Sequence, residues 1–197
     1  MFITFEGIEG SGKTTQINLV EAYLIKQGRE IIKTKEPGGT PLGMQIRQWL
    51  LNPEESFGSP YTELLLFYAD RLEHISKVIE PALAAGKIVL CDRFVDSTIA
   101  YQQGARGMSN ALISQLNALL PIMPKLTFLL DLSVEEGLRR AKNRAELDRF
   151  EHESVVFHQR VRQTYLDQSV LYPDRIKKIS VEGCSPDIVF DKISSFL

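Results

Sequence analysis

The chain has 197 residues, of which 44% are hydrophobic and 24% are charged, and this balance suits one compact domain spanning residues 1–197. The 23 Lys and Arg residues against 25 Asp and Glu residues give a net charge of −2. The chain therefore lacks the basic excess by which proteins bind the backbone of nucleic acids. The two cysteines form no C-x-x-C pattern, and no apolar run approaches the roughly 18 residues of a membrane span. We therefore expect a cytoplasmic protein that binds neither nucleic acid nor membrane.

Short apolar runs alternate along the chain with longer stretches of helical period, which is the pattern of a parallel sheet covered by helices. Strands are predicted at residues 2–6, 30–34, 88–92, 126–132 and 176–180. Helices are predicted at residues 14–27, 61–85, 109–119, 133–142 and 154–171, with a last one after Pro186. Pro81 is expected to bend the second of these helices. The expected fold class is α/β, a three-layer arrangement of a five-stranded parallel sheet with helices on both faces.

A glycine-rich loop joins the first predicted strand to the first predicted helix. Residues 7–14 (G-I-E-G-S-G-K-T) fit the P-loop pattern G-x-x-x-x-G-K-S/T, in which backbone N–H groups and a helix N-terminus face phosphate oxygens. The fold is therefore expected to be of the P-loop nucleoside triphosphate hydrolase type, with Lys13 at the β- and γ-phosphates and Thr14 at Mg²⁺. A turn that only caps a helix is the alternative interpretation. The predicted ATP-binding residues are Gly7, Ile8, Glu9, Gly10, Ser11, Gly12, Lys13, Thr14 and Thr15.

The P-loop by itself leaves the reaction open, since kinases, ATPases, GTP-dependent switches and motor proteins all contain one. The sequence holds no N-K-x-D guanine motif and no D-x-x-G switch motif. The apolar strand at residues 88–92 ends in Asp92, and Arg93 follows it. This places a carboxylate beside the P-loop for the Mg²⁺ shell and a guanidinium beside the phosphates. For Asp92 the alternative is an ordinary turn residue at a strand end.

Four segments in this order resemble bacterial thymidylate kinase: residues 7–15, 34–40 (T-K-E-P-G-G-T), 67–71 (F-x-x-D-R) and 92–97 (D-R-F-x-x-S). The resemblance runs over most of the chain, and the second and fourth segments together are specific to that family among P-loop kinases. It implies Mg²⁺-dependent in-line transfer of the γ-phosphoryl group of ATP to thymidine 5′-monophosphate (dTMP). The products would be ADP and dTDP, in dTTP biosynthesis, and the enzyme would be a homodimer.

The resemblance also implies an acceptor pocket. It places Arg47 and Arg93 at the acceptor phosphate, where a guanidinium fork makes paired contacts. Phe67 and Arg71 lie four residues apart on a predicted helix, so the ring can stack on thymine while the guanidinium donates to a carbonyl. Without the resemblance, core packing is the usual role of a helical Phe. The implied acceptor-binding residues are Glu9, Glu36, Pro37, Arg47, Phe67, Arg71, Arg93, Ser97, Thr98, Tyr101 and Gln102.

Catalysis is implied to use basic residues and a mobile lid. Glu9 would contact the sugar 3′-hydroxyl and Tyr101 would crowd the 2′ position. Gly10 matches the subgroup whose catalytic arginine comes from the lid, which we expect at about residues 137–151, where basic residues gather. The implied catalytic residues are Lys13, Arg93, Glu9, Arg144 and Arg149.

Two positions depart from the family pattern. Lys35 stands where arginine is common before E-P-G-G, which keeps the charge but loses the guanidinium fork, and Gln103 stands where glycine is common. Two alternatives stay open: a kinase for another nucleoside or nucleotide, and a nucleotide-dependent switch without an acceptor. Acceptor-dependent ADP release separates these possibilities.

Overall fold

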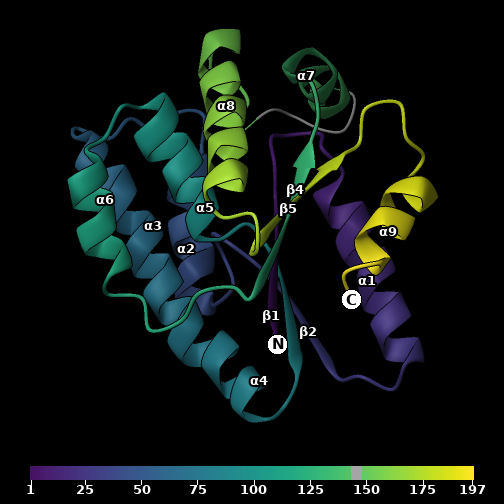
Figure 1. Ribbon diagram of the computed structural model, residues 1–197. Helices are drawn as coiled ribbons and strands as arrows, with labels where there is room; N and C mark the ends of the chain where they lie inside the picture. The colour runs from purple at the N-terminus through teal and green to yellow at the C-terminus, as the bar shows by residue number, and fades with distance from the viewer. Residues whose placement is uncertain (143–147) are drawn as a thin grey trace.

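The computed structural model describes residues 1–142 and 148–197, and its centre is a five-stranded parallel sheet in the order β2-β3-β1-β4-β5 (Figure 1). The strands are β1 (Phe2–Glu6), β2 (Ile31–Lys35), β3 (Ile88–Asp92), β4 (Leu126–Asp131) and β5 (Ile176–Ser180). The expected α/β fold with five parallel strands is confirmed. β2 lies one residue later than expected, and β4 ends one residue earlier.

Helices cover both faces of this sheet (Figure 1). On one face, α1 (Lys13–Lys26) packs beside α9 (Pro186–Ser194). On the other face, α8 (Val155–Leu171) packs on β4 and β5. The other helical segments are α2 (Pro41–Leu51), α3 (Pro60–His74), η1 (Ile75–Ile79), α4 (Glu80–Ala84), α5 (Val95–Thr98), η2 (Ile99–Ala105), α6 (Asn110–Asn117) and α7 (Val134–Lys142). Within the described ranges, no helix combines the length and apolarity that crossing a bilayer requires.

The three central strands β1, β3 and β4 are buried on both faces because successive side chains point to opposite helical layers, whereas the edge strands β2 and β5 are partly exposed. Ile3 of β1 and Leu90 of β3 belong to the hydrophobic cluster that includes Val20 of α1. Leu129 of β4 belongs instead to the cluster that includes Val161 of α8. This two-sided core fixes the carboxyl ends of β1 and β3, from which the P-loop and Arg93 emerge.

The helix expected at residues 61–85 is one helical run with a change of type. α3 passes into the π-helical turn η1, which passes directly into α4. Pro81 lies in the first turn of α4, where it has no N–H to donate. The irregularity therefore lies at the π-helical turn before the proline.

Two further helical segments lie outside the helix ranges that the sequence predicts. α2 begins after Thr40, whose hydroxyl accepts a hydrogen bond from the Gly43 N–H at 2.9 Å, with Pro41 at the first helical position. The other segment is α5, a single turn that passes into the π-type helix η2. Because the α-type part is so short, the apolar residues of this segment do not repeat with an α-helical period over a useful window.

The two-sided core gives a stability prediction. Leu90 is 0% exposed between the sheet and α1, so Leu90→Ala leaves a cavity that the surrounding side chains cannot fill. We expect the free energy of unfolding, measured by urea denaturation, to fall by about 2–5 kcal/mol. Leu119 is 60% exposed, and the control Leu119→Ala should change it by less than about 0.5 kcal/mol. Equal losses for the two variants would contradict this account of the core.

Candidate functional site

A cavity of about 970 Å³ opens at the carboxyl ends of β1, β2 and β3, the edge at which parallel α/β sheets bind ligands. Its walls come from the P-loop, the loop after β2, α2, α3 and the segment from the end of β3 through η2. Every residue expected at the acceptor lines this one cavity. These residues are Glu9, Glu36, Pro37, Arg47, Phe67, Arg71, Arg93, Ser97, Thr98, Tyr101 and Gln102.

The P-loop forms the floor of the cavity next to the acceptor side. Gly7, Ile8 and Ser11 do not line the cavity, and Gly7 and Ile8 line a smaller cavity instead. The residues expected to bind ATP that do line it are Glu9, Gly10, Gly12, Lys13, Thr14 and Thr15. Gly7, Gly10 and Gly12 have φ angles of 138°, 72° and 92°, a backbone region that side chains disfavour. The glycine spacing is thus required by the course of the loop.

Lys13 is buried and bends back over the P-loop. Its Nζ donates to the backbone carbonyls of Gly7 and Ile8, each at 3.0 Å. Burial, with the Arg93 guanidinium as a further cause, lowers the pKa of Lys13 to about 8. The ammonium is therefore held where loop-bound phosphates would lie.

Thr14 and Asp92 provide oxygen ligands beside Lys13. The Thr14 hydroxyl donates to Oδ2 of Asp92 at 3.3 Å, and both residues line the cavity. A hydroxyl and a carboxylate are the oxygen ligands that Mg²⁺ prefers. The pair expected from the sequence to hold Mg²⁺ is therefore adjacent in space.

Arg93 connects the P-loop to the acceptor side. Its φ is 68°, a left-handed conformation that is uncommon outside glycine and concentrates at functional sites. Nη1 donates to the Gly7 carbonyl at 3.0 Å, and Nη2 donates to Oε1 of Glu9 at 3.0 Å. Burial opposes the charge, but Tyr101, Tyr165 and Glu9 hold the pKa of Arg93 well above its ordinary value. Arg93 is fixed as a cation between the two halves of the cavity.

Glu9 is a carboxylate on the acceptor side of the P-loop. Its Oε1 accepts from Arg93 and also from the Tyr101 hydroxyl, while Oε2 lies 3.5 Å from Nδ1 of His158. Burial favours the neutral acid, but His158, Arg93 and Lys13 hold the pKa of Glu9 well below its ordinary value. No sequence pattern predicted a role for His158, which comes from the distant helix α8.

Phe67 and Arg71 share the cavity, as their spacing on a helix predicted. Arg71 is 1% exposed; its Nε donates to Oε2 of Glu36 at 2.7 Å and its Nη1 to Oγ1 of Thr98 at 3.0 Å. His74 contacts the other oxygen of Glu36 through Nδ1 at 2.8 Å. His74 lies one turn after Arg71 on α3, which is the only signal in the sequence that associates it with the site.

A second buried network lies beneath Arg93 and was not found from the sequence. Oε1 of Glu6 accepts from the Phe94 N–H at 2.7 Å, and Oε2 accepts from the hydroxyls of Ser97 at 2.6 Å and Tyr165 at 2.9 Å. Burial, and next the Asp96 carboxylate, raise the pKa of Glu6 to about 7. Within the sequence Glu6 is only the last residue of a strand.

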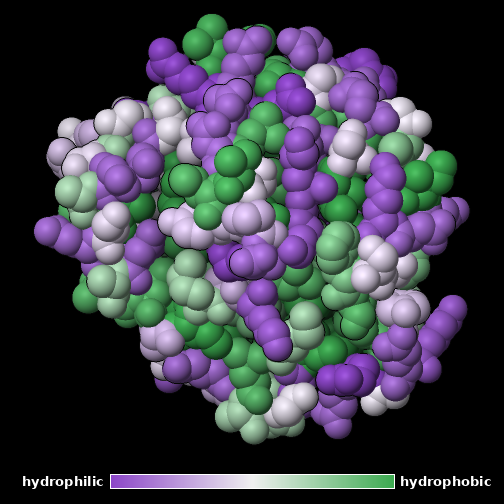
Figure 2. All heavy atoms as spheres, viewed as in Figure 1, coloured by the Kyte–Doolittle hydropathy of each residue, from purple (hydrophilic) through white to green (hydrophobic). Residues whose placement is uncertain are grey.

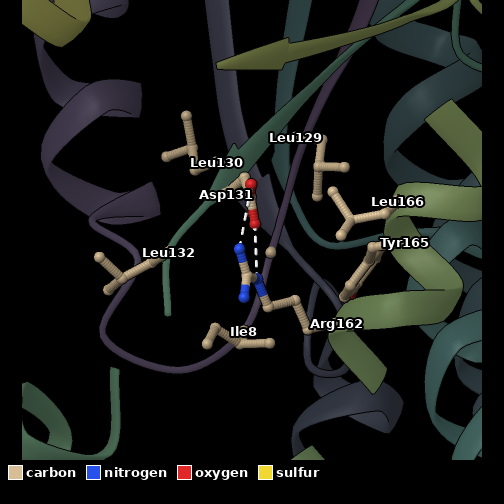
Figure 3. A pocket seen from close by; sticks show the side chains of 9 residues that line it. Ile8, Leu129, Leu130, Asp131, Leu132, Arg162, Tyr165 and Leu166 are labelled. Carbon is tan, nitrogen blue, oxygen red and sulfur yellow. Dashed lines mark hydrogen bonds and ion pairs between the residues drawn. The ribbon is translucent and has the colours of Figure 1, made fainter. Parts of the chain in front are cut away.

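A smaller cavity behind the P-loop has room for about one water molecule, at about 10 Å³, so it is no nucleotide site. Figure 3 shows Arg162 reaching from α8 to Asp131 at the end of β4, close to Ile8. Nε of Arg162 lies 2.8 Å from Oδ1 of Asp131. This ion pair and the Tyr165 hydroxyl hold α8 against the strand ends that carry the P-loop.

One of the two arginines expected to act from the lid, Arg149, pairs with α2 and α3 and does not line the cavity. Arg144 lies outside the described residues. The Nη2 of Arg149 lies 2.7 Å from Oε2 of Glu63, and its Nε donates to the Leu50 carbonyl at 2.8 Å. Arg149 thus contacts α2 and α3 and does not line the cavity. In this structure Arg149 pairs with Glu63, and its place at the phosphoryl group stays a prediction.

Arg140 is the basic residue of α7 that lines the cavity. It gets there because α7 lies directly on the P-loop: a Cβ on Gly10 would come within 2.3 Å of the Gly137 carbonyl oxygen. A Cβ on Gly137 would come within 2.7 Å of the Glu9 carbonyl oxygen. Figure 2 shows hydrophilic residues gathered at the upper end of the view, where Figure 1 places α7.

The raised pKa of Glu6 predicts how stability varies with pH. The folded state keeps a proton that the unfolded chain releases above about pH 4.5, so this contribution to stability is full below that pH and is lost as pH rises through about 7. Glu6→Gln stays neutral, so its free energy of unfolding relative to the wild type should rise by about 1 kcal/mol or more from pH 5 to pH 8. Urea denaturation at a series of pH values measures this difference.

The control for this comparison is Glu54→Gln, which changes an exposed carboxylate outside the cavity and should keep the wild-type dependence on pH. If Glu6→Gln also keeps that dependence, Glu6 does not hold a proton in the folded state.

Comparisons with known proteins agree with this geometry. The family model described as thymidylate kinase matches residues 5–193. A thymidylate kinase of Geotalea uraniireducens is 50% identical over 190 residues, which cover 92% of this chain and 88% of that protein. A thymidylate kinase of Acinetobacter baylyi is 49% identical over 195 residues, covering 98% of this chain and 96% of that protein. The crystal structure of thymidylate kinase from Ehrlichia chaffeensis superposes with a TM-score of 0.81 at 37% identity, covering 100% of this chain and 97% of that one. With a P-loop and an acceptor pocket in one cavity, this chain belongs to the thymidylate kinase family.

Proposed function

We propose that the 970 Å³ cavity binds dTMP beside Mg²⁺-ATP, and that its residues catalyse in-line transfer of the γ-phosphoryl group to the 5′-phosphate of dTMP, giving ADP and dTDP. The observation that carries this proposal is the Arg93 contact pair. One guanidinium binds the Gly7 carbonyl and the Glu9 carboxylate, two groups of the P-loop, and Arg93 lines the same cavity as Lys13 and Phe67, which supports adjacent donor and acceptor sites.

On the donor side, Lys13 would exchange its bonds to loop carbonyls for bonds to the β- and γ-phosphates. Thr14 and Asp92 would hold Mg²⁺, which supplies charge neutralisation for the phosphates when it is bound. Arg140 would reach the transferred group from α7, where its positive charge favours a transition state with charge spread over the phosphoryl oxygens.

On the acceptor side, Arg47 and Arg93 would hold the 5′-phosphate. Nη1 of Arg47 donates to the Pro37 carbonyl at 2.8 Å, which directs this guanidinium along the loop after β2. Glu9 would accept from the sugar 3′-hydroxyl, and the Tyr101 ring beside it would disfavour a 2′-hydroxyl. Positioning and electrostatics then supply the catalysis.

The base would lie between Phe67 and Arg71 at the far end of the cavity. Arg71 has Nε and Nη1 occupied by Glu36 and Thr98, which fixes the plane of its guanidinium. Its remaining donor, Nη2, would meet a thymine carbonyl. Phe67 is half-buried, which leaves ring surface for stacking on the base.

The family resemblance further implies a homodimer, a cytoplasmic location and a lid at about residues 137–151. These remain predictions. The exposed apolar residues of α3 would suit a dimer interface, since Tyr61 is 55% exposed and Leu65 is 54% exposed. The lid would include the end of α7, which already lies on the P-loop.

The proposal predicts which acceptor stimulates ADP release. We expect ADP release from Mg²⁺-ATP to be fastest with dTMP when the common ribo- and deoxyribonucleoside monophosphates are supplied one at a time in a coupled assay. Preference for another monophosphate would reassign the base pocket. Release that no acceptor stimulates would favour a nucleotide-dependent switch instead.

Lys13→Ala is the variant that should lose activity in this assay. It should reduce turnover at least about 1,000-fold because the transferred group loses its cation, while the melting temperature stays close to that of the wild type. Retained turnover would remove Lys13 from the mechanism.

The lid arginines give a second prediction about the same reaction. Arg139 and Arg140 both pair with Glu136, at 2.6 and 2.7 Å, but only Arg140 of these two lines the cavity. Arg140→Ala should lower kcat about tenfold or more, whereas Arg139→Ala should stay within about twofold of the wild type. Steady-state kinetics with dTMP measures both variants, and equal effects would show that position relative to the cavity does not matter.

A further inference from the structure

Glu63 is a buried carboxylate of α3 that no role in the phosphoryl transfer explains. It is 3% exposed; two hydrogen bonds from the η2 segment reach one of its oxygens, and an ion pair with Arg149 reaches the other. Gln102 Nε2 donates to Oε1 at 2.9 Å, and Arg106 Nε donates to the same oxygen at 3.1 Å. Arg149 Nη2 lies 2.7 Å from Oε2. Contacts on both oxygens fix the orientation of the carboxylate.

This carboxylate determines which way the Gln102 amide faces. A carboxylate paired with two guanidinium groups can only accept hydrogen bonds, so the NH₂ end of the amide must face Glu63. The opposite orientation would set the amide oxygen of Gln102 against the carboxylate oxygens. The amide is therefore oriented by chemistry, with its oxygen Oε1 directed away from Glu63.

Gln102 lines the cavity together with Phe67 and Arg71, the residues assigned above to the base. Thymine presents an N3–H donor beside its O4 carbonyl. The Oε1 acceptor of Gln102 and the donors of Arg71 match this edge. Cytosine presents an N3 acceptor beside an amino group, and the amide of Gln102 would suit it only in the opposite orientation.

We propose that Glu63 is a specificity-determining positioning residue, which holds the amide oxygen of Gln102 toward the base so that the pocket selects a keto pyrimidine over an amino pyrimidine. The inference rests on the proposed function, because it takes a pyrimidine monophosphate as the occupant of the cavity. Unsatisfied or repelling polar groups give strong discrimination in such pockets, because the wrong base leaves buried groups unpaired.

The test is Glu63→Gln, with the affinities of dTMP, dUMP and dCMP measured by calorimetry in the absence of ATP. A glutamine at position 63 can donate or accept, so both orientations of the Gln102 amide become available. We expect the ratio of dTMP to dCMP affinity to fall about tenfold. The ratio of dTMP to dUMP affinity should stay unchanged, since both bases present the same N3–H and O4 edge.

Glu153→Gln is the matched control. Oε1 of Glu153 lies 2.8 Å from Nη2 of Arg106. Gln102 donates to Glu63, and among the described residues no hydrogen bond joins it to Glu153. This variant should keep the wild-type ratio of dTMP to dCMP affinity. If Glu153→Gln lowers that ratio as much as Glu63→Gln does, loss of charge around Arg106 explains the effect and the proposal is wrong.

A double-mutant cycle with Gln102→Leu separates positioning from general support of the fold. Without the amide, Glu63→Gln should cause no further change in selectivity, whatever it does to the melting temperature. A further fall of similar size would overturn the proposal. If Glu63→Gln does not fold, Glu63→Asp withdraws the carboxylate by one methylene group, and a smaller fall in the same direction is expected.

The affinities of the wild-type protein separate a wrong acceptor from a wrong role of Glu63. A wild-type protein that does not prefer dTMP to dCMP would overturn the proposed acceptor, and the role of Glu63 with it. A wild-type protein that prefers dTMP, together with a Glu63→Gln variant of unchanged selectivity, would overturn only the role of Glu63.

Discussion

The guanidinium of Arg93 lies where the phosphate loop meets the acceptor side of the cavity, and it binds both. It donates to the Gly7 carbonyl and to Glu9, and its backbone holds a left-handed conformation at the end of β3. A buried cation of this kind persists only when partners surround it. Arg93 also donates to the hydroxyls of Ser97 and Tyr165, which bind Glu6, so it joins the network around Glu9 to the network around Glu6.

Buried carboxylates orient the groups that face the ligands. Glu36 holds Arg71, Glu9 holds Arg93 and Tyr101, and Glu63 holds Gln102. In each case an acceptor-only group, removed from water, leaves the donor next to it one favourable orientation. The cavity thus presents a fixed pattern of donors and acceptors before any nucleotide enters, which is the preorganisation that positioning and electrostatic catalysis require.

Close packing decides which basic residue of α7 lines the cavity. Gly10 and Gly137 let α7 lie on the P-loop, and this contact brings Arg140 to the cavity. Arg149 follows later in the chain and is drawn instead to Glu63 and the end of α2. Charge density along residues 137–151 therefore does not by itself show that Arg140 lines the cavity and Arg149 does not, because Glu63 pairs with Arg149.

The sequence by itself determined the parallel sheet, the P-loop and the shared helix face of Phe67 and Arg71, whereas the other residues expected around the acceptor came from the resemblance to a family. Those features rest on local patterns: apolar runs of strand length, glycines at positive φ, and the helical spacing of Phe67 and Arg71. Only the tertiary structure decided the π-type helix η2, the partners of Glu6 and Glu63, and the place of Arg149. These depend on side chains that lie far apart in the chain and meet only when α3, η2 and α8 pack together, and no local pattern records such meetings.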